Sequence, residues 1–265
     1  MVDAYWQLVK AQVRSQAQYR TSFALDLVFS TLVSTLDIAA VFALFSVTGG
    51  LGGFGGPSVL LVAGLSALAF ALADLVCGNA EKLRERVRTG TFDALLLRPL
   101  SSLGQLLATH FAARRAGRVV QGAVVYGLGL GVADIDWTAP KAALAVVAPI
   151  AGAVLFGSLF VIGATTAFWW VESGEVANAF TYGGRDFTAY PLTVYGGGVF
   201  GRFFSFGIGM AFVAYLPALA LLDVPDPLGV PDWLRWCSPL TALVAALAAA
   251  AVWRTGVRHY RGTGS

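Results

Sequence analysis

The chain has 265 residues, of which 57% are hydrophobic and only 12% are charged, with a formal net charge of +3. Ordinary soluble domains carry about 25% charged residues, so this composition excludes a large soluble domain and indicates a membrane protein. If each membrane crossing takes about 20 apolar residues, six crossings use about 120 residues and leave modest connectors within one transmembrane domain, 1–265.

The amino-terminal segment, 1–20, predicts a helix that lies on the membrane surface rather than crossing it. One face carries apolar residues at intervals of three or four, while lysine, arginine and glutamine make up most of the rest. This pattern suits the cytoplasmic interface, and an ordinary cytoplasmic extension is the alternative. The apolar face is formed by Val2, Trp6, Val9, Val13 and Ala17.

The first apolar run, 23–47, predicts the first span and contains a polar stripe. Its members are spaced by four, four and three residues, so they share one side of a helix. Ionisable groups in hydrocarbon normally face the bundle interior, water or a partner. The stripe is therefore either a polar wall along a translocation path or a set of groups that holds the bundle together, and Asp74 in the second span raises the same alternatives. The stripe consists of Asp26, Ser30, Ser34 and Asp37.

Five further apolar runs predict the remaining spans. The run at 142–171 is longer than a bilayer requires, so its helix tilts or projects into the interface, where Phe168, Trp169 and Trp170 suit the headgroup belt. Prolines between the last two runs end any helix there. The five predicted spans are 58–78, 119–132, 142–171, 203–222 and 238–253.

The positive charges predict that both termini face the cytoplasm. In the six-span scheme, all but two of the 18 lysines and arginines fall on one side, and the exceptions are Lys141 and Arg235. Basic loops stay in the cytoplasm. The scheme therefore places the long connectors 79–118 and 172–198, together with Arg202, on the cytoplasmic side.

The first long connector predicts two short helices beneath the membrane. Gly90 can end the first helix, and Thr91 can cap a second one that presents Phe92 and Leu97 before Pro99 stops it. A stiff amphipathic element in this position would give a cytoplasmic subunit a contact surface through which it could exert force on the membrane helices. A basic helix that only anchors the topology is the alternative.

The sequence contains none of the motifs that would indicate catalysis. It has no G-x-x-x-x-G-K-[ST] phosphate loop, no G-x-S-x-G elbow and no H-E-x-x-H motif. His110 and His259 have no acidic or cysteine partner at ligand spacing, so no metal site is predicted. We therefore predict a protein that is not an enzyme and that takes any driving energy from another subunit.

Three blocks of the sequence, in this order, resemble the permease subunits of type-2 ABC transporters, in a bacterial six-span subfamily. They are RTGTFDALLLRPLS (88–101), NAFTYGGRDFTAYPLTVY (178–195) and WCSPLTALVAALAAAAVWRTGVRHYRGTGS (236–265). The resemblance implies an all-α integral membrane protein with six transmembrane helices, an N-terminal interfacial helix and a coupling helix between spans two and three. It also implies an outer re-entrant segment at Pro231–Pro239, which contains Trp233 and Trp236.

The resemblance further implies two contact regions for an ATPase subunit. The coupling helix would cover Glu81–Leu100, and a second region would cover Asn178–Tyr195, where Gly183, Gly184 and Pro191 favour a folded turn. A plain interfacial loop is the alternative for the second region. The implied contact residues are Arg84, Arg88, Thr91, Phe92, Asp93, Leu97, Arg98, Tyr182, Arg185 and Asp186.

The implied function is that of a permease subunit of an ATP-driven exporter in the bacterial inner membrane. Its partners would be a second permease chain, identical or related, and two ATPase subunits that hold ATP and magnesium, while this chain binds no cofactor and no nucleic acid. A lipophilic or cationic substrate would suit the apolar spans and buried aspartates. A self-contained secondary transporter or channel that uses those aspartates is the main alternative, and a membrane enzyme or scaffold is another.

Overall fold

The computed structural model describes residues 54–109, 115–195 and 198–260, and otherwise only the single residues Gln7, Lys10 and Val28. The predicted interfacial helix, the predicted first span and the polar stripe Asp26, Ser30, Ser34 and Asp37 therefore lie outside the described ranges. Within these ranges every regular element is a helix. The predicted all-α class is confirmed.

Three of the described helices are long and apolar enough to cross a membrane. They are α3 (Gly56–Cys77), which continues through a 3-10 turn as far as Arg88, α8 (Ala139–Thr165), which continues to Phe168, and α12 (Ser238–His259). A fourth apolar helix, α7 (Ala116–Val132), is shorter, at 17 residues. These apolar helices are those expected of a membrane-embedded chain.

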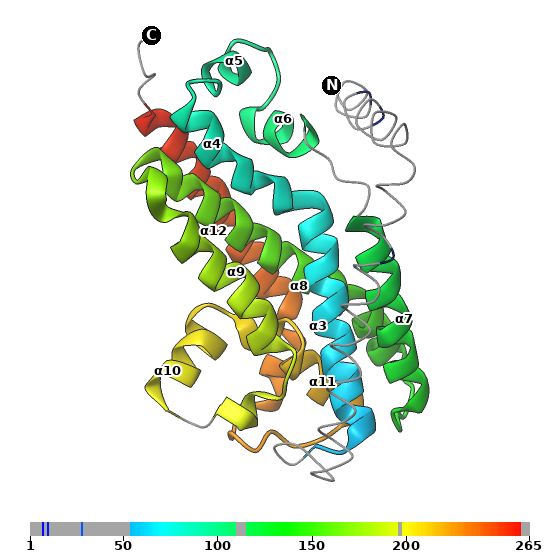
Figure 1. The fold of residues 1–265 in the computed structure, drawn as a ribbon. Coiled ribbons are helices and arrows are strands. Elements are labelled where there is room, and N and C mark those ends of the chain that lie inside the picture. The colour runs from blue at the N-terminus through cyan, green and yellow to red at the C-terminus, as the bar shows by residue number, and fades with distance from the viewer. Residues whose placement is uncertain are drawn as a thin grey trace.

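The helices α3 and α7 lie side by side and approach each other to backbone contact (Figure 1). A Cβ atom added at Gly64 of α3 would lie 2.7 Å from the Cα atom of Tyr126. A Cβ atom added at Gly129 of α7 would lie 2.8 Å from the Cα atom of Leu61. Small residues at such an interface allow close packing where lipid supplies little hydrophobic driving force. The helix α8 packs on the other side of α3 and also contacts α12.

Three short helices, α4 (Leu83–Arg88), α5 (Asp93–Leu96) and α6 (Ser102–Thr109), gather at one end of the bundle, near the carboxyl end of α12 (Figure 1). We call this end the basic end, because it carries Lys82, Arg84, Arg86, Arg88, Arg98, Arg115, Arg118, Arg254 and Arg258. The amino ends of α3, α8 and α12 lie at the opposite end.

The second long connector does not fold as predicted. Residues Gly174–Thr188 form one helix, α9, which passes through Gly183 and Gly184 without a turn. The chain turns only after Thr188, just before Pro191, so the predicted turn does not lie at the two glycines; a Cβ atom at Gly184 would lie 2.5 Å from Cε of Met210. The helix α9 runs back along α8 and α3 (Figure 1). At its last residue, the hydroxyl of Thr188 shares a buried 2.7 Å hydrogen bond with the hydroxyl of Ser66, which joins α9 to α3.

The predicted fifth span, 203–222, is not one helix. It consists of a π turn at Phe203–Gly207, a 3-10 turn at Met210–Phe212 and the buried helix α11 (Tyr215–Leu222). Gly209 separates the two turns with a φ of +91°, a conformation that favours glycine. The preceding helix α10 (Val199–Arg202) lies nearer the opposite end (Figure 1). Arg202, its last residue, is therefore not in a loop at the basic end, where the charge count placed it.

At the opposite end, Asp226 organises the proline-rich loop that precedes α12. Its Oδ1 atom accepts hydrogen bonds from the Tyr215 hydroxyl, at 2.6 Å, and from the Leu228 amide, at 3.1 Å. Its Oδ2 atom accepts a 3.1 Å hydrogen bond from the Val230 amide. The predicted re-entrant segment follows as a short 3-10 helix, Asp232–Trp236, which packs on α11.

We expect Asp226→Ala to destabilise the protein by about 1–3 kcal/mol, because it leaves the buried Tyr215 hydroxyl and two amides without their acceptor. Thermal unfolding in mild detergent would measure the loss. Tyr215→Phe removes only one of the three hydrogen bonds and should cost less. An unchanged melting temperature for Asp226→Ala would show that this carboxylate does not hold the loop.

Candidate functional site

The α4–α5 element, which we define as residues 83–98, projects from the end of α3 and occupies the predicted coupling position. Its first helix continues α3 through a 3-10 turn, Gly78–Lys82, so that one helical rod extends as far as Arg88. Gly90, with a φ of +71°, ends this rod as predicted. Thr91 does not cap α5, because Phe92 occupies the cap position and no side chain caps the helix there.

Phe92 lies inside the protein, although the resemblance implied that it contacts a partner. Its side chain has no exposed surface. The ring packs against Phe168 at the end of α8, with centroids 5.1 Å apart, and against Tyr260 just beyond α12, at 5.0 Å. Trp253 of α12 completes this group, which we call the aromatic cluster: Phe92, Phe168, Trp253 and Tyr260. Phe92 therefore joins the element to its own bundle.

The outer surface of the α4–α5 element has an apolar tip surrounded by positive charge. Leu97 is 87% exposed and Leu96 is 44% exposed, which is unusual for large apolar side chains on a short, fixed turn. Asp93 is half-buried. Arg88, Thr91 and Arg98 are exposed on the element, as is Glu85, while Arg84 is turned toward the start of α9.

Gln105 of α6 holds the turn that carries this tip. Its buried Nε2 atom donates hydrogen bonds to the carbonyl oxygens of Leu95, at 2.9 Å, and Leu100, at 3.0 Å. These bonds tie both ends of the exposed stretch to one side chain. The tip is therefore presented by a fixed backbone.

The base of the element is held by an ion-pair cluster around Asp74. The Asp74 carboxylate is almost fully buried and pairs with Arg115 at 3.4 Å and with Arg118 at 3.2 Å. Arg115 also donates to the Asp74 carbonyl oxygen at 3.0 Å and to the Asn79 side-chain oxygen at 3.1 Å. Asp74 thus joins α3 to the start of α7, which favours its interpretation as a residue that holds the bundle together.

The second predicted contact region lies along the bundle rather than beside the apolar tip. The ring of Tyr182 packs on Phe70 of α3, with centroids 5.6 Å apart, and the Arg185 guanidinium carbon lies 5.6 Å from the centre of the same ring. Asp186 is exposed on α9.

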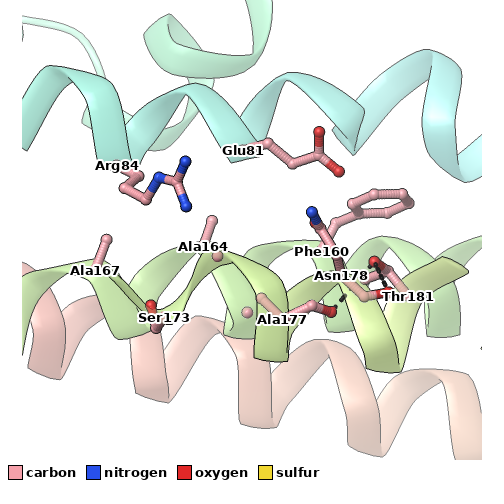
Figure 2. Close-up of a pocket in the computed structure, with 11 residues that line it drawn as sticks. Glu81, Arg84, Phe160, Ala164, Ala167, Ser173, Ala177, Asn178 and Thr181 are labelled. Atoms are coloured by element: carbon pink, nitrogen blue, oxygen red, sulfur yellow. Dashed lines mark hydrogen bonds between the residues drawn. The ribbon is translucent and has the colours of Figure 1, made fainter. Parts of the chain in front are cut away.

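A cavity of about 160 Å³ lies between the start of the element and the helices α8 and α9. Figure 2 shows Glu81 and Arg84 on one wall and Ala164, Ala177 and Asn178 on the other. The opposite wall belongs to α8 and α9 and is built mainly from alanine and glycine, whose small side chains leave the space open. The cavity therefore lies beside the start of the element, whereas Leu83 and Val87 of α4 are buried against the bundle.

Sequence reasoning missed Gln105, Arg115, Arg118, Trp253 and Tyr260, which position the element. From the sequence, Arg115 and Arg118 served only to assign the cytoplasmic side of the membrane. No local sequence pattern indicates the role of Gln105. In the part of the chain that the structure describes, no group of three or more histidine, cysteine, aspartate or glutamate side chains could hold a metal ion.

Comparison with known proteins gives one result. A family model described as ABC-2 family transporter protein matches residues 31–264 and thus includes the α4–α5 element and both of its attachments. Neither a curated protein nor a solved structure matches the chain.

Proposed function

This chain belongs to the ABC-2 family of transporter proteins as a membrane permease, and we propose that it is an exporter subunit whose α4–α5 element binds a separate ATPase subunit. The exposed tip formed by Leu96 and Leu97 carries this proposal, because it stands on a rod continuous with the membrane helix α3. A stiff connection of this kind can deliver displacement from the partner to the membrane helices.

The chemistry of the tip indicates what the partner surface offers. Protein interfaces place a few apolar anchors at the centre and polar groups at the rim. Leu97 would be the anchor, and Arg88 and Arg98 would form the rim. The partner is therefore a subunit with an apolar groove bordered by acidic side chains, which also holds ATP and magnesium. The permease binds no cofactor of its own and contributes no hydrolytic step.

The complete transporter would contain two permease chains, identical or related, above two ATPase subunits. The basic end would face the cytoplasm of a bacterial cell, with both termini on that side. Nucleotide-driven closure of the ATPase pair would then displace the α4–α5 elements and tilt the spans, so that substrate moves outward. The secondary-transporter alternative gains no support from Asp74, because two arginines neutralise its charge.

Substitution of the apolar tip tests the proposal. The full chain is purified from native membranes in mild detergent, and the ATPase activity and nucleotide-binding subunits that accompany it are measured. Wild type should retain the ATPase subunit, whereas Leu97→Asp should lower its recovery at least about tenfold, as for an interface anchor. Leu97→Met keeps an apolar side chain at the same position and should retain binding. A wild-type chain that purifies without any ATPase would overturn the proposed function.

A further inference from the structure

The α4–α5 element is attached to the rest of the bundle in two places. At its base it continues α3 and lies beside the Asp74 ion pairs, and at its tip Phe92 enters the aromatic cluster. The cavity lies beside the start of the element, where Glu81 and Arg84 face α8 and α9 (Figure 2). A displacement of the tip therefore reaches the bundle through α3, through the buried side chains of α4, or through Phe92, and towards the start of α9 the contact is made by the Arg84 guanidinium against Gly174.

Each ring of the aromatic cluster contacts at least two of the other three. Phe92 meets Tyr260 and Phe168 edge to face, with interplanar angles of 83° and 63°. Phe168 in turn lies 5.7 Å from Trp253 and 5.5 Å from Tyr260, measured between ring centroids. Such edge contacts define the relative orientation of the rings, and a close-packed interior passes strain on rather than absorbing it.

On the side of the bundle, the cluster is formed by the carboxyl ends of α8 and α12, which contact each other. A Cβ atom added at Gly256 of α12 would lie 2.5 Å from Cγ2 of Thr165 and 2.7 Å from Cδ2 of Phe168. The carboxyl ends of α8 and α12 therefore touch with no side chain between them at Gly256. Movement of the Phe92 ring would push on both helices together.

The remaining side chains around Phe92 bind it to the element rather than to α9. Leu83, Val87 and Leu95 of the element are buried in the same cluster as Phe92 and Trp253. Phe92 is thus surrounded on one side by α4 and α5 and on the other by α8 and α12.

We propose that Phe92 is a positioning residue that transmits movement of the α4–α5 element to the carboxyl ends of α8 and α12 through the aromatic cluster. This inference rests on the proposed function, since the movement originates in the ATPase subunit. It assigns different tasks to neighbouring residues: Leu97 holds the partner, and Phe92 passes the displacement on.

Hydrogen exchange of the whole transporter complex, with and without ATP, magnesium and orthovanadate, tests this assignment. In wild type, trapping the nucleotide should change amide exchange in the α4–α5 element and at the carboxyl ends of α8 and α12. In Phe92→Ala the ATPase subunit should still be recovered and the element should still respond, but the response of α8 and α12 should be lost. The Phe92→Tyr variant, which keeps an aromatic ring, should show the wild-type response at α8 and α12. The Phe180→Ala variant, which removes a stacked ring on α9, should show that response as well.

Trp253→Phe serves as a second variant if Phe92→Ala does not fold, and it should weaken the response at α8 and α12 while ATPase recovery stays normal. Persistence of the full response in either folded variant would overturn the role of the cluster while leaving ATPase binding established. Loss of ATPase recovery in wild type would instead remove the proposed function.

Discussion

Asp74→Asn is expected to destabilise the protein by about 3–5 kcal/mol, the cost of leaving a buried charge without its partner. Asparagine keeps the shape of the side chain but removes the charge that two arginines face. The Arg115 side chain is only 16% exposed, so water cannot replace the lost carboxylate. The same substitution removes the ion pairs that join α3 to the start of α7, and leaves the hydrogen bonds from Arg115 to the Asp74 carbonyl oxygen and to Asn79.

Thermal unfolding of the purified chain in mild detergent would measure this loss. Glu85→Gln provides the control, because Glu85 is 60% exposed and its ion pair with Lys82 joins two exposed side chains. Exposed pairs contribute at most about 1 kcal/mol, so this variant should unfold close to wild type. Equal melting temperatures for Asp74→Asn and Glu85→Gln would show that the buried pairs carry no net stability.

The second large effect is expected at the interface between α3 and α7. Gly129→Ala places a methyl group against the backbone of Leu61, which cannot move aside as a flexible side chain can. Overpacking of this kind costs about 1–3 kcal/mol. Gly122→Ala should act similarly, since its Cβ atom would lie 2.8 Å from the Cα atom of Leu68.

The same helix offers a matched control for this prediction. A Cβ atom at Gly131 meets nothing within 4 Å of its position, so Gly131→Ala should change only helix propensity. Alanine is preferred to glycine inside a helix by about 0.5–1 kcal/mol. The two substitutions should therefore shift the melting temperature in opposite directions. A stabilising effect of Gly129→Ala would mean that α7 does not pack on α3 as described.

Several features of the site follow from local sequence. Apolar runs predicted the positions at which α3, α7, α8 and α12 lie, because the tendency of a segment to enter a membrane depends on its own composition. Gly90 ends α4 as expected, because a left-handed turn needs a residue without a side chain. The ATPase-contact role of the exposed residues, such as Leu97 and Arg98, stays a prediction.

Other features depend on partners that are distant in the chain. Phe92 and Leu97 are both apolar residues of one short amphipathic segment, yet one is fully buried and the other is 87% exposed. The difference arises because Phe168, Trp253 and Tyr260 close around one of them. In the same way, Gly184 locally favours a turn but lies in a helix, where Met210 packs against it.

The sequence by itself determined that the chain lies in a lipid bilayer, that it is helical, and that a basic element of two short helices follows α3. Hydropathy, charge and the position of Gly90 are local signals that each depend on only a few neighbouring residues. Only the tertiary structure decided which face of that element is exposed, that Asp74 pairs with Arg115 and Arg118, and that α9 returns along the bundle. These outcomes depend on contacts between residues far apart in the chain, whose free energies are absent until the helices pack.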